Sequence, residues 1–179
     1  MPTKNIVFIA TSLDGYIAGP NGELDWLHSI PNPEQKDTGF EALLQEIDAL
    51  LMGRVTFETV VGFGGDWPYP KPVFVLSNNL ESIPEAFQDK AFLVKGSLQE
   101  VLKGIHQQGY QQLYIDGGQT IQHFLAEDLI DELRITQLPI LLGKGIPLFG
   151  ELAQPLDFEH LKTVVYLEQL VQSHYQRKR

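Results

Sequence analysis

The sequence predicts a single α/β domain, in which a mostly parallel mixed sheet carries helices on both faces. Two observations support this prediction. Short apolar runs rich in β-forming residues alternate with segments of helical periodicity, and residues 162–176 have the pattern of one or two long antiparallel strands. Strands that alternate with helices form parallel sheets with both faces covered. A length of 179 residues suits one hydrophobic core, so we expect one domain over residues 1–179.

The expected strands follow one another along the chain as compact apolar runs. Runs of four to eight such residues bounded by polar or glycine-containing segments are typical of buried strands. They are IVFIAT, ALLMG, VFVLS, AFLVKG, QLYID and DELRITQLPIL. The glycine- and proline-rich segment between ALLMG and VFVLS, residues 62–72, is expected to be a surface loop.

The expected helices lie between these strands. FEALLQEI carries its apolar residues at the spacing of one helical face. Another helix begins with Ser97 and Glu100, which form a capping-box pair, and ends near Gly109. Helical spacing returns at Ile121, after the two glycines that follow QLYID.

Composition and charge exclude several classes of function. The chain has no cysteine, which excludes disulfides, thiolate metal sites and cysteine nucleophiles, and which suits a reducing cytoplasm. A formal net charge of −10 repels nucleic-acid phosphates, so no nucleic-acid partner is expected. No apolar run approaches the roughly 20 residues of a membrane helix. The first apolar run lacks a cleavage site of small residues, so we interpret it as a strand of a cytoplasmic protein.

Two glycine-marked junctions follow predicted strands, GRVT at residues 53–56 and DGGQTI at residues 116–121. Ligands bind beyond the carboxyl ends of strands in open α/β sheets. Free backbone N–H groups at a helix N-terminus bind anions, and glycine permits close approach. Two such junctions and Arg54 would suit a cofactor with a diphosphate. The alternative is that each glycine only serves turn geometry, and sequence spacing alone does not decide between them.

Other sources of chemistry are missing from the sequence. It contains no G-x-G-x-x-G fingerprint, no P-loop and no G-x-S-x-G elbow. The five histidines never fall at metal-ligand spacing, so no metal site is expected. Any chemistry therefore has to come from a bound cofactor.

Several segments resemble a known family. LLMGRVTFE, VFVLSNN, YIDGGQTIQHFL and DELRITQLPILLGKGIPLF occur in the order and spacing of the dihydrofolate-reductase-like fold. SLDGYIAGPNGELDWL and the pattern DELxxxxxPxLLGxGxPLF resemble one branch more closely. That branch is the reductase domain of bacterial bifunctional deaminase-reductases of riboflavin biosynthesis, together with its free-standing relatives. The resemblance covers nearly the whole chain.

This resemblance implies a fold, an activity and an assembly. The fold is a dihydrofolate-reductase-like arrangement of three layers. The activity is NADPH-dependent hydride transfer to a small heterocyclic or carbonyl/imine substrate, as in 5-amino-6-(5-phosphoribosylamino)uracil reductase. The assembly is a homodimer, which would also cover the long closing strands. Dihydrofolate reductase is the alternative enzyme, and a nucleotide-binding module without turnover is the alternative of another class.

The resemblance also implies roles for individual residues. The two glycine junctions would hold the NADPH diphosphate, and the residues after VFVL would lie near the adenosine 2′-phosphate. Ala10 and Ile17 would lie beside the nicotinamide, and Trp26 would line the substrate site. The implied cofactor-binding residues are Ala10, Ile17, Gly53, Arg54, Thr56, Leu76, Ser77, Asn78, Gly117, Gly118, Gln119, Thr120 and Ile121.

Three departures from the family pattern bear on the ligands. Many relatives have an arginine where this chain has Asn78, so NADH is possible beside NADPH. Lys36 is the only lysine or arginine between Trp26 and Gly53, although a ribose phosphate substrate would require such groups there. The deaminase half is missing. The physiological substrate can therefore differ from that of the riboflavin pathway.

A proton donor for the reduced substrate is the last expected feature. Asp37 opens the helical segment DTGFEALLQEI, near the place where dihydrofolate reductases carry an acidic residue, and an apolar cleft would raise its pKa. The alternative is that Asp37 only caps the helix. Asp14 and Asp25 are the other candidates near the substrate, with Asp14 also suited to a turn. Asp116 is expected to fix the Gly-Gly turn.

Overall fold

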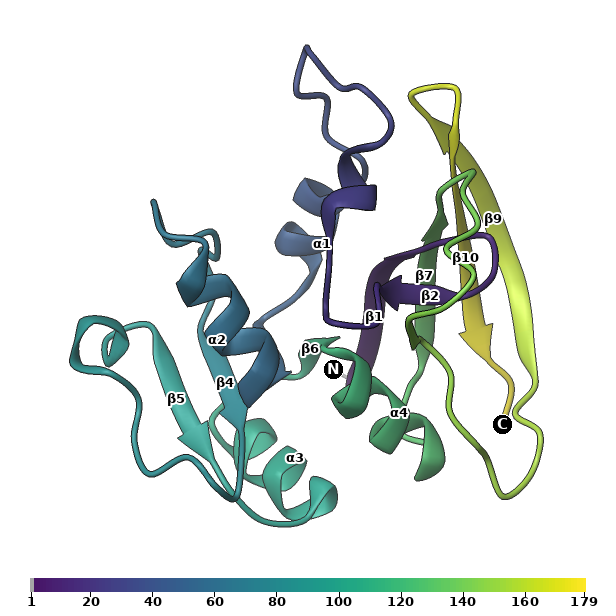
Figure 1. Ribbon diagram of the computed structural model, residues 1–179. Helices are drawn as coiled ribbons and strands as arrows, with labels where there is room; N and C mark the ends of the chain where they lie inside the picture. The colour runs from purple at the N-terminus through teal and green to yellow at the C-terminus, as the bar shows by residue number, and fades with distance from the viewer. Residues whose placement is uncertain (1) are drawn as a thin grey trace.

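Alternating strands and helices assemble as the apolar pattern predicts. The computed structural model describes residues 2–179, and an eight-stranded sheet with the order β5-β4-β3-β6-β1-β7-β10-β9 runs through it (Figure 1). Six strands are parallel, and β10 pairs antiparallel with both β7 and β9. The strands are β1 (Lys4–Thr11), β3 (Ala49–Gly53), β4 (Val73–Leu76), β5 (Ala91–Val94), β6 (Gln112–Asp116), β7 (Glu132–Gln137), β9 (Phe158–Tyr166) and β10 (Leu170–Arg177). The predicted mixed, mostly parallel sheet with a closing antiparallel pair is confirmed.

Helices cover both faces of this sheet because successive strand residues point to opposite sides. On one face α3 and α4 pack on residues such as Leu51 and Ile115. On the other face α1 and α2 pack on the alternate residues, including Leu50 and Met52. The helices are α1 (Phe40–Glu46), α2 (Arg54–Gly62), α3 (Leu98–Gln107) and α4 (Gly118–Ala126), with the 3-10 turns η1 (Asp25–His28) and η2 (Glu85–Phe87).

The local signals that predicted α3 are present in the structure. The Ser97 hydroxyl accepts a hydrogen bond from the Glu100 N–H, and the Glu100 carboxylate accepts one from the Ser97 N–H. The two bonds satisfy N–H groups that have no partner within the helix. Gly109, with φ of 97°, follows the helix end.

Some elements differ from the prediction. A small antiparallel sheet pairs β2 (Tyr16–Ala18) with β8 (Ile146–Pro147), and strands of two or three residues are too short to show a period. The strand predicted over DELRITQLPIL ends at Gln137, before Pro139, which has no N–H for a sheet. α1 begins at Phe40 and not at Asp37. Within residues 2–179, no helix is long and apolar enough to span a membrane.

Candidate functional site

The two glycine junctions lie side by side at the carboxyl edge of the sheet. β3 and β6 are neighbouring parallel strands, and their register pairs Met52 with Asp116. α2 starts directly after Gly53, and α4 starts directly after Gly117. Two strand-to-helix turns distant in the sequence thus reach the same place in the fold.

Each turn packs a threonine of its helix against the glycine of the other turn. A Cβ placed at Gly117 would lie 2.5 Å from the Thr56 hydroxyl, and one placed at Gly53 would lie 2.7 Å from the Thr120 hydroxyl. Side chains at these positions would collide, and Gly117 in addition has φ of 99°. The glycines therefore allow two helix N-termini to approach each other closely.

The paired helix ends form a place suited to an anion. A helix N-terminus carries partial positive charge and N–H groups without helical partners, so two such ends favour a negative group between them. The first turns remain accessible, since Val55 is 62% exposed and Gln119 is exposed. This glycine-lined cradle fits the diphosphate of a dinucleotide.

Arg54 adds a mobile cation to this cradle. Its guanidinium donates to both carboxylate oxygens of Glu58, at 2.9 and 3.2 Å, and its side chain is 42% exposed. An exposed ion pair of this kind stabilises a protein by about 1 kcal/mol at most. Arg54 can therefore turn from Glu58 to a bound phosphate at small cost.

Ile17 and Ala10 are the two predicted neighbours of the nicotinamide. Ile17 lies next to the start of α4, and Ala10 lies on β1, the strand beside β6. A Cβ placed at Gly118 would lie 2.5 Å from Ile17 Cδ1, so Ile17 of β2 covers the first residue of α4. Ala10 is half-buried near the carboxyl end of β1, where it is in register with Thr136. β1 is the neighbour of β6 on the side opposite β3.

Five of the predicted cofactor residues make contacts within the fold. Ile121 is fully buried in the core, and its N–H donates to the Gly117 carbonyl at 2.8 Å. The buried Thr120 faces Gly53. The Ser77 hydroxyl accepts hydrogen bonds from two N–H groups in the following turn, and Asn78 Oδ1 accepts one from Gly96 N–H at 3.2 Å. Leu76 is half-buried and packs on the core from β4.

Asp116 is the titratable group that the structure adds to this site. It is half-buried at the end of β6, and its Oδ1 accepts a hydrogen bond from Gly117 N–H at 2.9 Å. Desolvation raises the pKa of Asp116 to about 6, against the lowering effects of the Gly117 N–H and the Tyr114 hydroxyl. The charge of Asp116 and, more strongly, burial raise the pKa of Tyr69. A carboxyl group with such a pKa can hold or release a proton near neutral pH.

Aromatic rings lie on the same face of the sheet as Asp116. Phe8, Phe40 and Tyr114 form a cluster with ring centroids 6.0 to 6.4 Å apart. Tyr114 precedes Asp116 by two residues on β6, so their side chains point to one face. Its hydroxyl donates to the Phe8 carbonyl at 3.1 Å.

The other predicted carboxylates have structural partners or lie in solvent. Asp37 is exposed, and its carboxylate accepts hydrogen bonds from the N–H groups of Gly39 at 2.9 Å and Glu41 at 3.1 Å. The apolar surroundings expected for Asp37 are therefore absent, and its carboxylate binds an N–H of the first turn of α1, whose N-cap residue is Gly39. Asp14 binds the Ser12 hydroxyl and the N–H groups of residues 142 and 143, which joins two loops, and Asp25 is exposed on η1.

Trp26 has a buried donor without a partner. Only 8% of the residue is exposed, and its Nε1 finds no hydrogen-bond acceptor among residues 2–179. A buried unpaired N–H costs free energy, so such groups are rare unless they serve another purpose. The nitrogen itself has almost no accessible surface, and Trp67 Nε1 is buried and unpaired in the same way, so this group does not by itself mark a ligand site.

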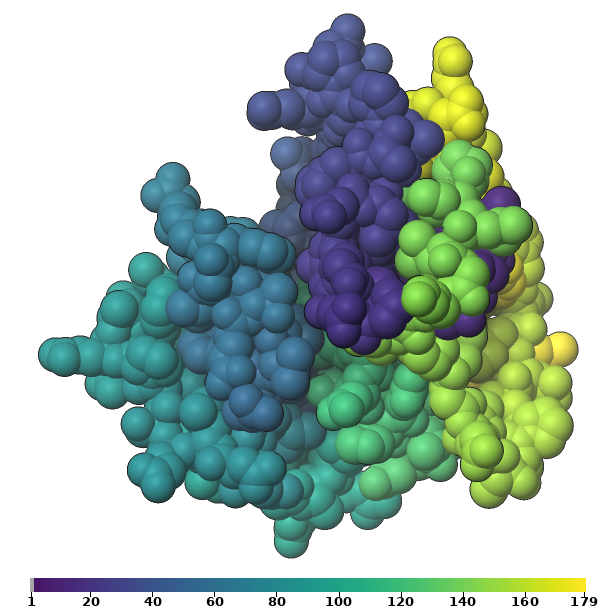
Figure 2. All heavy atoms as spheres, viewed as in Figure 1, coloured from purple at the N-terminus to yellow at the C-terminus, as the bar shows by residue number. Residues whose placement is uncertain are grey.

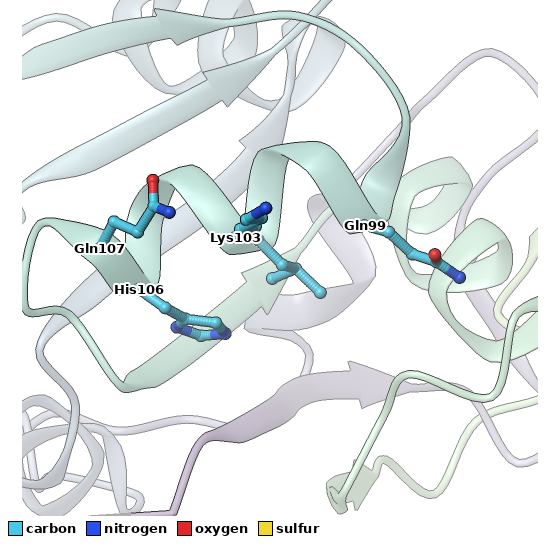
Figure 3. A pocket seen from close by; sticks show the side chains of 5 residues that line it. Gln99, Lys103, His106 and Gln107 are labelled. Atoms are coloured by element: carbon cyan, nitrogen blue, oxygen red, sulfur yellow. The ribbon is translucent and has the colours of Figure 1, made fainter.

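The surface around these elements is hollowed. In Figure 2 a groove separates the blue surface over α2 from the purple surface of the N-terminal segment, with green atoms of α4 below it. A different depression lies on α3 alone, where Gln99, Lys103, His106 and Gln107 line it (Figure 3). That depression is remote from the glycine junctions in sequence and has no side chain from a second element.

Comparison with known proteins agrees with this architecture. The family model of the RibD C-terminal domain matches residues 3–171. An uncharacterized protein of Bacillus subtilis (strain 168), YwjB, is 33% identical over 99% of both chains. The crystal structure of a candidate riboflavin biosynthesis protein from Shewanella sp. PV-4 is 58% identical, covers 98% of this chain and 99% of its own, and has a TM-score of 0.96.

More distant structures share the fold. Dihydrofolate reductase from Enterococcus faecalis, complexed with NADP(H), aligns over 98% of this chain and 97% of its own, with a TM-score of 0.68 and 20% identity. The deaminase/5-amino-6-(5-phosphoribosylamino)uracil reductase of Thermotoga maritima has a TM-score of 0.72 and 14% identity. This chain matches 57% of that longer protein and is itself covered over 99%.

The raised pKa of Asp116 predicts how stability depends on pH. A carboxyl group that binds its proton more tightly in the fold than in the unfolded chain stabilises the fold at low pH. That contribution is lost as the pH rises through about 6. Asp116→Asn removes this titration. We therefore compare the free energy of unfolding of the variant with that of the wild type at two pH values. Between about pH 4 and about pH 7.5, the difference should change by roughly 2 kcal/mol in favour of the variant. Urea denaturation at the two pH values measures this difference.

Asp14→Asn is the control, because the pKa of Asp14 is shifted in the opposite direction to that of Asp116. Hydrogen bonds, first of all from Ser12, lower the pKa of Asp14, so its contribution is present at neutral pH and is lost as the pH falls. The Asp14 variant should therefore lose stability relative to the wild type at about pH 7.5. Equal pH dependence of the wild type and Asp116→Asn would contradict the prediction for Asp116.

Proposed function

The chain belongs to the RibD C-terminal domain family, and on that premise we propose that it is a reductase that takes a hydride from a nicotinamide dinucleotide. The resemblance favours NADPH, and NADH is the other possible donor. The acceptor is a small heterocyclic or carbonyl/imine compound. The single observation that supports the proposal most strongly is the contact between the two glycine junctions, which forms a cradle for a diphosphate.

The cradle and its surroundings give each part of the cofactor a place. Gly53, Gly117 and the first turns of α2 and α4 would hold the diphosphate, with Arg54 closing on it. When bound, the reduced nicotinamide supplies the hydride. Ile17 and Ala10 would support the nicotinamide end, because they flank the cradle on the β1 side of the sheet.

Asp116 is the proposed proton donor to the reduced substrate. Its pKa of about 6 leaves part of the population protonated near neutral pH, while a solvent-exposed aspartate would be almost fully ionised. It directly precedes the Gly117 turn and so lies at the edge of the cofactor cradle. The rings near Asp116 would pack against a planar molecule.

The substrate is proposed to resemble the pyrimidine of the riboflavin-pathway reductases without needing its phosphate. Lys36 is the only lysine or arginine between Trp26 and Gly53, and its ammonium group pairs with Glu34 at 2.9 Å. A ribose phosphate would find little compensation for its charge in that segment. Dihydrofolate is the second candidate acceptor, since the fold aligns with a dihydrofolate reductase over nearly its full length.

Oxidation of NADPH and NADH in the presence of a substrate panel tests the proposed activity. The panel contains 5-amino-6-(5-phosphoribosylamino)uracil, its dephosphorylated form, dihydrofolate and oxidised pteridines. Loss of reduced-nicotinamide absorbance with any member supports a reductase. Binding of the cofactor without turnover across the panel would instead favour a nucleotide-binding module.

Arg54→Ala is expected to weaken the binding of both NADH and NADPH by about 1.5 kcal/mol, roughly tenfold, because the diphosphate is common to them. Fluorescence titration with each cofactor measures the change. Arg179→Ala is the matched control, since the Arg179 side chain is 44% exposed and also pairs with a carboxylate. Unchanged affinities in the Arg54 variant would remove this residue from the site.

Asp116→Asn should lower turnover by roughly 100-fold or more, the scale of general acid catalysis, with cofactor affinity changed little. In the wild type kcat/KM should fall as the pH rises through about 6, and the variant should lose this dependence. Asp37→Asn is the control, because asparagine caps a helix about as well as aspartate. If Asp37→Asn loses activity and Asp116→Asn keeps it, then Asp37 is the proton donor and Asp116 has only a structural role.

A homodimer is proposed from the resemblance and from the free edge of the sheet. β9 is the last strand of the order, and Leu161 and Val165 on it are 48% and 57% exposed. Such edges are usually covered. Light scattering at micromolar concentration should give twice the mass of one chain, and Val165→Lys should shift the value toward a single chain. A wild-type mass of one chain would refute the dimer.

A further inference from the structure

A second cavity lies next to the cofactor cradle. It has a volume of about 530 Å³ and lies between the first turns of α2 and the segment that follows β4. It is an open depression lined mostly by exposed residues, so a ligand there would lie against the surface and stay partly in solvent. The residues that line it are Arg54, Glu58, Asn79, Leu80, Glu81 and Ser82.

The order of the strands indicates which part of a dinucleotide would occupy this cavity. The diphosphate cradle lies between β3 and β6, and the proposed reacting end lies toward β1, where Ile17 and Ala10 are found. A dinucleotide extended along the carboxyl edge then has its adenosine half on the opposite side, toward β4. The cavity is at that place, and Arg54 belongs to both the cradle and the cavity.

The charges of the cavity are unsuited to a second phosphate. One guanidinium faces two carboxylates, and Arg54 already donates to both oxygens of Glu58. Glu81 is exposed in the same lining. A ribose 2′-phosphate carries one to two negative charges and would be repelled, whereas 2′- and 3′-hydroxyl groups can donate to carboxylates. Dinucleotide sites for NAD use an acidic residue in this way, and those for NADP use an arginine.

We propose that this cavity binds the adenosine ribose in its 2′-hydroxyl form, and that Glu58 and Glu81 make NADH the preferred cofactor over NADPH. The inference rests on the proposed function, because it names the cofactor form taken by the same site. Glu81 acts as the acceptor for the ribose hydroxyls. Glu58 is the second carboxylate of the lining, and its charge is left without a partner when Arg54, the only cation in the lining, turns to the diphosphate.

Lys95 is the nearest alternative cation along the carboxyl edge. It follows β5 and precedes Gly96, whose N–H donates to Asn78 Oδ1 at 3.2 Å. It is exposed in solvent and does not line the cavity. Lys95→Ala therefore should leave both affinities unchanged, and a selective loss of NADPH affinity in that variant would count against the assignment.

Titration of the whole protein with NADH and with NADPH, followed by tryptophan fluorescence, tests the inference. The wild type should bind NADH more tightly. Glu81→Gln and Glu58→Gln should each shift the ratio of the two dissociation constants toward NADPH by roughly fivefold, because each removes a negative charge near the 2′ position. Glu127→Gln is the matched control, since this exposed residue follows the far end of α4 and should leave the ratio unchanged.

The outcomes separate this inference from the proposed function. A wild type that binds NADPH at least as tightly as NADH overturns the inference and leaves the reductase standing. An unchanged ratio in both glutamate variants also overturns it. Failure to bind either dinucleotide overturns the inference and the proposed function together.

Discussion

The close contact between the β3–α2 and β6–α4 turns is the constraint on which the rest of the site depends. Thr56 faces Gly117, and Thr120 faces Gly53, so neither helix can begin elsewhere without losing the contact. A side chain at either glycine would displace the threonine that faces it. The arrangement concentrates the positive ends of two helices at one point of the sheet edge. That positive potential comes from the backbone, so a chain with a net charge of −10 can still hold an anion there.

Side-chain charges around this backbone cradle then serve selection more than affinity. Arg54 pairs with Glu58 in an exposed ion pair, and Glu81 lies in the same lining, so the side chains add no net positive charge. The backbone cradle thus determines affinity for the diphosphate. The side chains beside it determine which form of the ribose, with or without a 2′-phosphate, is accepted. Replacing one carboxylate can therefore change the preference between the two ribose forms without disturbing the packing of the diphosphate cradle.

Much of the fold and the position of the cradle could be predicted from the sequence, because they depend on local patterns. Buried strands, helical faces, the Ser97–Glu100 capping box and the glycines after β3 and β6 are all visible within a few residues. The proton donor could not be predicted in the same way. Asp37 is exposed and Asp116 is half-buried, and burial depends on residues far away in the sequence. The two short strands β2 and β8 pair 130 residues apart and carry no periodic signal.

Asp116 connects the electrostatics of the cradle to the proposed chemistry. Its Oδ1 accepts a hydrogen bond from Gly117 N–H, the residue that begins the α4 turn. This bond favours the ionised carboxylate, whereas desolvation favours the protonated one and dominates, which gives a pKa of about 6. A diphosphate held at the same turn would add negative charge nearby and would disfavour the carboxylate further. Cofactor binding would then raise the pKa of Asp116 and increase the fraction that carries a proton, so more of the protein would be ready to protonate a substrate when the hydride donor is present.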